Sequence, residues 1–149
     1  MENIFSDDYF MKKALQEAQA AFDRGEVPVG AIVVIDNKII ARAHNLTETL
    51  NDVTAHAEMQ AITSAADFLG GKYLKKCTMY VTLEPCQMCA GALYWSQISK
   101  IVYGARDHER GCIHLNTKLH PKTEMTGGVL EQECSEIIKR FFIQQRNLN

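Results

Sequence analysis

Two short segments of the chain combine residue types that could do chemistry together. The first is His56-Ala57-Glu58, and the second, further along, is Pro85-Cys86-Gln87-Met88-Cys89. An imidazole and two thiols are soft metal ligands, while the carboxylate of Glu58 is not needed as a ligand. A structural zinc ion takes four protein ligands, whereas a catalytic one takes three and leaves a position for water. The residue types therefore predict a hydrolytic zinc site with His56, Cys86 and Cys89 as ligands.

The spacing of the two cysteines favours the start of a helix. In a helix that begins at Pro85, the sulfur atoms of Cys86 and Cys89 lie on the same side of the first turn. Proline suits the first helical position because its missing N–H donor is no loss there. The positive end of the helix dipole favours the thiolate, which is the form that binds metal.

His56 and Glu58 can act together only at the end of a helix. Two positions turn a helix by roughly 200°, so the two side chains point to opposite sides of it. They converge on one object only if it lies off the helix end, and Thr54 is the residue expected to cap this helix. We therefore expect two helix N-termini to face each other across the metal, at the carboxyl ends of parallel strands.

Glu58 is the predicted general base. Zinc lowers the pKa of a bound water toward roughly 7, although two thiolates make the metal a weaker acid than three histidines would. A nearby carboxylate is then useful to take the proton, and Glu58 supplies it.

A CxxC pair by itself is also typical of a structural zinc half-site or of a redox dithiol. A redox dithiol would leave His56 and Glu58 unexplained. A structural site would need a fourth ligand, yet none of the remaining candidates has paired ligand spacing: Cys77, Cys112, Cys134 and His44. The presence of both segments, each at a helix start, favours the catalytic zinc site.

Length and composition are those of an ordinary globular protein. The 149 residues fit a single domain, 1–149, that is long enough to bury a core without disulfides. Hydrophobic residues at 46% and charged residues at 23% exclude an intrinsically disordered chain. A net charge of −2 provides no overall attraction to phosphate groups.

The N-terminal segment 1–10 is acidic at Glu2, Asp7 and Asp8, and it contains no apolar run of signal-peptide length. No stretch approaches the length of a membrane span. The five cysteines form an odd set, and thiols in a chain without an export signal are expected to stay reduced. These features predict a cytoplasmic protein without a membrane partner.

Apolar periodicity and turn residues predict helices alternating with strands. Asp7 or Asp8 caps the first helix, and the first two strands form a hairpin. Strands separated by helices favour parallel pairing with right-handed crossovers. Helices are expected at 7–24, 55–68, 85–96 and 130–146; strands at 29–35, 38–43, 78–83 and 98–104, with a short edge strand at 124–127; and a loop with room for one short helix at 106–123.

Several strings of the sequence resemble those of a known enzyme superfamily. The HxE and PCxxC segments match the signature of the cytidine deaminase superfamily, and nearly the whole chain resembles the bacterial tRNA adenosine deaminases within it. Further matching strings are Glu26-Val27-Pro28-Val29-Gly30, Thr54-Ala55-His56-Ala57-Glu58, Val81-Thr82-Leu83-Glu84-Pro85-Cys86, Met88-Cys89-Ala90-Gly91-Ala92 and Gly104-Ala105-Arg106-Asp107.

The resemblance implies a fold, an assembly and a reaction. The fold is a three-layer α/β/α arrangement, cytidine-deaminase-like, with a five-stranded mixed sheet and helices on both faces. The assembly is a homodimer with one zinc ion per subunit. The reaction is hydrolytic deamination of the wobble adenosine of a tRNA anticodon to inosine, with attack at C6 of the flipped-out adenine. Glu58 would take a proton from the water and protonate N1, and it would later protonate the departing ammonia.

The resemblance also assigns contacts to the target nucleoside. Asn45 matches an asparagine that hydrogen-bonds the nucleoside, with a turn residue as the alternative. Val27, Pro28 and Val29 match the segment that packs on the base, although a proline before a strand is also ordinary. Ala55, in one of the matching strings, is assigned to the substrate as well.

Contacts to the rest of the RNA are assigned to a loop and to the last helix. Asp107 matches a loop residue near the nucleic-acid backbone, with a solvated loop charge as the alternative. The last helix carries Phe141, Phe142 and Arg146, similar to the family helix that meets the anticodon loop. Aromatic faces stack on unpaired bases, so Phe142 and Arg146 are expected to contact the RNA. A core position in an amphipathic helix fits one of the two phenylalanines equally well.

Some features depart from the tRNA deaminases. The segment 108–123 is shorter than in the better-known members and lacks part of their pattern. Tyr94-Trp95 and the connection 69–74 are closer to guanine deaminases of the same superfamily. A small-molecule purine deaminase, acting on a free base or nucleoside, is therefore the alternative function. A zinc-bearing partner subunit without turnover would be expected to lack the carboxylate that Glu58 provides.

Overall fold

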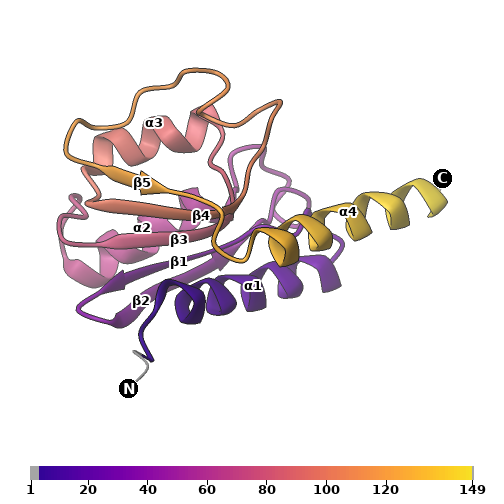
Figure 1. Cartoon of the computed structure of the whole chain (residues 1–149), viewed down its shortest axis with the longest axis horizontal. Helices are drawn as coiled ribbons and strands as arrows, with labels where there is room; N and C mark the ends of the chain where they lie inside the picture. Colours follow the sequence, from indigo (N-terminus) through magenta and orange to yellow (C-terminus); the bar gives the residue numbers. More distant parts are fainter. Residues whose placement is uncertain (1–3, 149) are drawn as a thin grey trace.

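Within residues 4–148, which the computed structural model describes, five strands form a mixed sheet between two layers of helices (Figure 1). Glu2 of the acidic N-terminal segment lies outside the described residues. The strands are β1 (Gly30–Ile35), β2 (Lys38–His44), β3 (Thr78–Leu83), β4 (Lys100–Ala105) and β5 (Glu124–Thr126). The helices are α1 (Asp7–Asp23), α2 (Ala57–Leu69), α3 (Gln87–Ser96) and α4 (Glu131–Leu148).

The sheet has the strand order β2-β1-β3-β4-β5. β1 pairs antiparallel with β2 and β3, whereas β3–β4 and β4–β5 are parallel, so the expected hairpin, edge strand and mixed sheet are confirmed. The hairpin turns at Asp36 and Asn37, whose φ angles of 50° and 61° suit a two-residue turn. Leu83 pairs with Ala105 in the parallel register, so the segments that follow β3 and β4 start at the same edge of the sheet.

Apolar side chains alternate along the strands and give the sheet two buried faces. Val33 belongs to the core that includes Ala61 of α2 and Leu93 of α3. Its neighbour Ile32 belongs to the core that includes Met11 of α1 and Cys134 of α4. The helices are therefore divided two to a face among the described residues, as Figure 1 shows, and the expected three-layer architecture is confirmed.

The first helix is capped by a residue other than the two that the sequence suggested. Ser6 is the N-cap of α1, and its Oγ accepts a hydrogen bond from the Tyr9 N–H over 3.1 Å. Asp7 and Asp8 lie in the first turn, where their charge favours the helix dipole. A serine hydroxyl accepts hydrogen bonds from the free amides of the first turn as well as a carboxylate does. Which of these residues becomes the N-cap therefore depends on the residue at which the backbone turns into the helix.

The starts of α2 and α3 correct two further expectations. The Thr54 hydroxyl donates to Asp52 Oδ1 over 2.8 Å instead of capping α2, and His56 occupies the N-cap. Pro85 precedes the N-cap of α3, which is Cys86. Both helices therefore begin two residues later than expected, at Ala57 and Gln87. Two of the predicted metal ligands consequently stand at helix N-caps.

The strand 78–83 is confirmed at both ends, and the remaining bounds either match or shift by one or two residues at the ends of helices and strands. The described segment 106–123 forms turns and contains no helix. Gly30 begins β1 and has a steric role, because a Cβ there would collide with the backbone oxygen of Ala14 in α1. None of the helices within 4–148 has the length and apolar character that a membrane crossing requires.

Candidate active site

One group of metal-ligating side chains stands out among the described residues, and it consists of His56, Cys86 and Cys89. The His56 Nδ1 lies 3.7 Å from the Cys86 Sγ and 3.6 Å from the Cys89 Sγ. All three ligand atoms lie within 4.8 Å of one another. Zn–S and Zn–N bonds of about 2.3 and 2.0 Å in a tetrahedron separate N from S by about 3.6 Å. The spacing therefore fits a zinc ion, and a set of three protein ligands fits a catalytic one.

The cluster forms where two helices begin on the same face of the sheet. His56 is the N-cap of α2, while Cys86 is the N-cap of α3 and Cys89 lies in its first turn. Both helices therefore point their positive ends at the cluster, which favours thiolates. The expectation that helix N-termini meet beyond the carboxyl ends of the parallel strands β3 and β4 is confirmed.

The ionisation of the cluster is shared between its members. Hydrogen bonds from Cys89 and His56 lower the pKa of Cys86 to about 4. The Cys89 pKa is raised, because its thiol donates to Cys86 and because it is buried. The hydrogen bond to Cys86 also raises the His56 pKa. The group thus stabilises a thiolate at Cys86 through protons on Cys89 and His56. A divalent cation would take the place of those protons.

Glu58 lies in the first turn of α2 beside the cluster and is 3% exposed. Burial raises the pKa of its carboxyl group to about 7. A carboxyl group with a pKa near neutrality can both accept and release a proton at physiological pH. Its position and its environment both suit a general acid and base.

A cavity of about 640 Å³ opens beside the cluster. Most of the residues assigned from the sequence line it: Val27, Val29, Asn45, His56, Glu58, Cys86, Asp107 and Phe142. Pro28 and Ala55 are buried and do not contribute to the described lining. Arg146 is exposed on α4 and also lies outside this lining. The metal ligand Cys89 is buried and is likewise not part of the lining. The structure thus brings assigned residues from six separate segments to one cavity and leaves four assigned residues off its wall.

The two phenylalanines of α4 have different environments. Phe141 is 6% exposed and packs edge-to-face on Phe22 of α1, with ring centroids 5.9 Å apart. Phe142 is 45% exposed and lines the cavity. The interpretation that one of the pair is a core residue is confirmed for Phe141.

Two buried carboxylates were not assigned from the sequence, and one of them, Glu84, lines the cavity. Glu26 is 0% exposed and Glu84 is 2% exposed. Both residues stand in strings that match the tRNA deaminases, but the resemblance assigns a role to neither of them. Further lining residues without an assignment are Thr47, Ala57, Leu83, Arg106, His108, Glu109, Arg110 and Ile138.

Glu26 fixes the turn that follows Asn45. Its Oε1 accepts from the Glu48 N–H over 3.0 Å, and its Oε2 accepts from the Thr49 N–H and hydroxyl, both over 2.6 Å. Asn45 is buried, and its Oδ1 accepts from the Thr47 N–H over 3.3 Å. Asn45 therefore has the turn role that was its alternative reading, and it lines the cavity at the same time.

We expect Glu26→Gln to destabilise the protein in a pH-dependent way. Burial alone would raise the Glu26 pKa, but the hydrogen bonds from Thr49 and Glu48 outweigh it and hold the pKa below its usual value of 4.5. A lowered pKa stabilises the fold above the unfolded value, and the contribution is lost as pH falls through the folded value. Denaturant titration should show a loss of about 1–3 kcal/mol at neutral pH, and this loss should shrink as the pH falls below 4.5. Glu48→Gln, at the exposed neighbour, is the control, and an equal loss there would contradict the assignment.

The fold and the site define a class of protein. A mixed five-stranded sheet that carries a His-Cys-Cys group and a buried glutamate to one cavity is the arrangement of the cytidine-deaminase-like deaminases. The family model for MafB19-like deaminases matches residues 5–146. The tRNA-specific adenosine deaminase of Bacillus subtilis is 45% identical over 146 residues, which cover 94% of this chain and 91% of that protein. The chain belongs to the family of tRNA-specific adenosine deaminases.

Solved structures agree with this placement. A chain from biochemical and structural studies of A-to-I editing by tRNA:A34 deaminases is 42% identical, with a TM-score of 0.82, and covers 87% of this chain and 98% of that one. The guanine deaminase of Bacillus subtilis is 40% identical with a TM-score of 0.65, but covers 68% of this chain and 65% of that one. The likeness to the tRNA deaminase therefore extends over more of both chains.

Proposed function

We propose that this protein deaminates the wobble adenosine of a tRNA anticodon to inosine, with release of ammonia. The observation that carries the proposal is the buried Glu58 beside the group of His56, Cys86 and Cys89, with Glu58, His56 and Cys86 lining one cavity. The family placement supports the choice of substrate, because the relatives that match nearly the whole chain are tRNA-specific adenosine deaminases.

The reaction exchanges the exocyclic amino group of adenine for an oxygen from water. His56, Cys86 and Cys89 would hold a zinc ion, which would supply the acidity that makes water a nucleophile at neutral pH. Glu58 accepts the proton from that water and delivers it to N1 of the purine as the new bond to C6 forms. Glu58 then carries the second proton to the amino group, which leaves as ammonia. The Glu58 pKa of about 7 suits both transfers.

The cavity wall holds the base in reach of these groups. Val27 and Val29 supply apolar surface on which the purine packs, and Asn45 hydrogen-bonds the nucleoside. Pro28, between Val27 and Val29, and Ala55, directly before His56, are buried and support the cavity wall from behind. Asp107 belongs to the loop at the cavity mouth.

The second half of α4 offers a surface for RNA. Phe142 lines the cavity, and residues 137–148 contain Lys139, Arg140 and Arg146 but no acidic residue. In Figure 1 this end of α4 projects beyond the sheet. A cationic helix with an exposed aromatic ring suits the phosphates and unpaired bases of an anticodon loop. This local charge compensates for the overall net charge of −2.

A panel of substrates tests the proposal. We expect the purified protein to convert adenosine to inosine in an anticodon stem-loop with adenosine at the wobble position. The same stem-loop with that adenosine moved by one nucleotide, and free adenine, guanine, cytosine and their nucleosides, should release little ammonia. Turnover of guanine with an inert stem-loop would overturn the proposal in favour of a free-purine deaminase.

We also propose a homodimer that acts in the cytoplasm. Trp95 of α3 is 77% exposed and Val53 is 84% exposed, and a second subunit would cover such apolar side chains. All five cysteines are free, which suits a reducing compartment. Sedimentation velocity should give twice the 16.8 kDa chain mass, and a species with the mass of one chain would contradict the dimer.

A further inference from the structure

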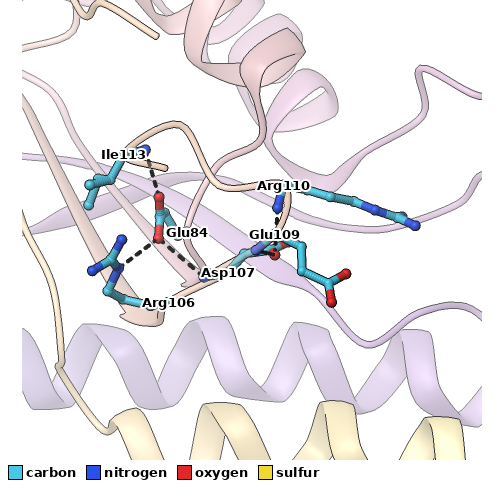
Figure 2. A network of polar contacts seen from close by, with 6 residues as sticks. All are labelled: Glu84, Arg106, Asp107, Glu109, Arg110 and Ile113. Atoms are coloured by element: carbon cyan, nitrogen blue, oxygen red, sulfur yellow. Dashed lines mark hydrogen bonds and ion pairs between the residues drawn. The ribbon is translucent and has the colours of Figure 1, made fainter. Parts of the chain in front are cut away.

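A second buried carboxylate organises the loop at the mouth of the cavity. Glu84 follows β3, and its side chain is 0% exposed. Its Oε1 accepts from the Arg106 Nε over 3.3 Å and from the Asp107 N–H over 3.2 Å. Its Oε2 accepts from the Ile113 N–H over 2.8 Å. Figure 2 shows both ends of the segment 106–113, here called the mouth loop, converging on this one carboxylate.

The mouth loop is packed tightly around Glu84. A Cβ at Gly111 would collide with the Glu84 carboxylate and with the Asp107 backbone oxygen. Gly111 also forms an antiparallel bridge with the ligand residue Cys86, and the Cys112 N–H donates to the Pro85 oxygen over 2.9 Å. The loop is therefore fitted to the carboxylate on one side and to the start of α3 on the other.

The interior of the mouth loop has a hydrogen-bonded turn of its own. The Asp107 Oδ1 accepts from the Glu109 N–H over 3.1 Å and from the Arg110 N–H over 2.9 Å. These bonds order the turn locally, but they do not attach it to the sheet. In Figure 2 the Arg110 side chain extends away from the Glu84 network. Residues 106–110 all line the cavity, so the attachment through Glu84 determines the position of this part of the cavity wall.

We propose that Glu84 is a positioning residue that holds the mouth loop in place for the RNA around the target adenosine. The inference rests on the proposed function. Glu84 acts through the backbone amides of Asp107 and Ile113, and it takes no part in the proton transfers of Glu58. Loss of its second acceptor therefore weakens the fit of the RNA more than the chemical step. The effect belongs in KM rather than in kcat.

Glu84→Gln is the direct test, because it keeps the volume of the side chain. The amide oxygen can replace only one carboxylate oxygen, so either the Arg106–Asp107 side or the Ile113 side of the loop faces an N–H group instead of an acceptor. Hydrogen–deuterium exchange should be at least about tenfold faster in peptides covering 106–113 and unchanged in α2. The zinc content should equal that of the wild type.

Kinetics separate positioning from a merely structural role. With the anticodon stem-loop, we expect the KM of Glu84→Gln to rise about tenfold while kcat stays within about threefold. Glu84→Asp, which restores two acceptor oxygens, should recover part of the KM. Glu124→Gln is the control, because Glu124 is exposed at the start of β5, beside the start of β4 rather than its end.

Three results would overturn the inference: unchanged exchange in 106–113, faster exchange that spreads through α2 with loss of zinc, or an unchanged KM, with or without a fall in kcat. The exchange experiment needs no RNA, so it does not depend on the proposed function. If the wild type deaminates guanine and ignores the stem-loop, the proposed function fails and the RNA part of the inference fails with it. Faster exchange in 106–113 with an unchanged KM would reject the positioning role of Glu84 and leave the proposed function intact.

Discussion

Glu58→Gln should abolish deamination while the protein keeps its metal. The amide has the size of the carboxyl group but cannot accept a proton from water or return one to the purine. General acid and base catalysis contributes about 10²–10⁴-fold, so we expect kcat on the stem-loop to fall by at least about 10³-fold, because Glu58 serves two transfers. Single-turnover inosine formation and metal analysis of the purified protein measure the two effects separately.

Another carboxylate of the cavity wall provides the control for this prediction. Glu109 lines the same cavity but is exposed on the mouth loop, away from the first turn of α2. Glu109→Gln should therefore keep its kcat to within a small factor. Near-normal turnover by Glu58→Gln would remove Glu58 from the mechanism. Loss of metal from Glu58→Gln would show that the carboxylate supports the ligands rather than the reaction.

The chemistry of the site could be predicted from the sequence because it depends on local spacing. His56 and Glu58 cannot face one object from the middle of a helix, and Pro85 directly before Cys86 favours a helix start, with Cys86 and Cys89 on one side of it. Both constraints place the residues at helix starts, and the structure has them there. Each start lies two residues later than expected. At α2 the Thr54 hydroxyl is bonded to Asp52, which no helical pattern reveals, and at α3 Pro85 precedes the N-cap Cys86 instead of following it.

The supporting carboxylates could not be predicted because their partners are distant and carry no residue signature. Glu84 is 29 positions from Ile113 and binds its backbone N–H, which every residue except proline possesses. Glu26 binds the backbone of Glu48 and Thr49 in the same manner. A pattern of side-chain types contains no information about such pairs. Only the folded chain brings these amides to a buried carboxylate.

The division between Phe141 and Phe142 also needed the fold. Adjacent positions on a helix are about 100° apart, so either ring could have pointed to the core. Phe141 is buried because α1 presents Phe22 beside it, and Phe142 is left at the cavity. Substrate contacts lie on several segments that meet only in space, so the sequence could assign them by resemblance alone.

Cys89→Ala should lose the metal and destabilise the fold, whereas Cys77→Ala should keep the metal. Both cysteines are 0% exposed, so the two variants remove the same atoms from equally buried sites. Only Cys89 belongs to the ligand group within the described residues. Metal analysis should show full occupancy in Cys77→Ala and almost none in Cys89→Ala. A lower Tm of both variants by a similar amount would show that packing, not metal, explains the loss.

The difference in Tm between the two variants reports how much metal binding stabilises the fold. The N-termini of α2 and α3 both direct positive dipole ends at the cluster and favour thiolates there, and a divalent cation takes the place of the protons that the thiols lose. Metal that binds only the folded chain adds its binding free energy to folding, so its loss should lower Tm by about 10 °C or more beyond the packing effect. A chelator should lower the Tm of the wild type and Cys77→Ala by that amount and leave Cys89→Ala unchanged. A chelator-sensitive Cys89→Ala would place the metal on other ligands and remove His56, Cys86 and Cys89 as the site of the reaction.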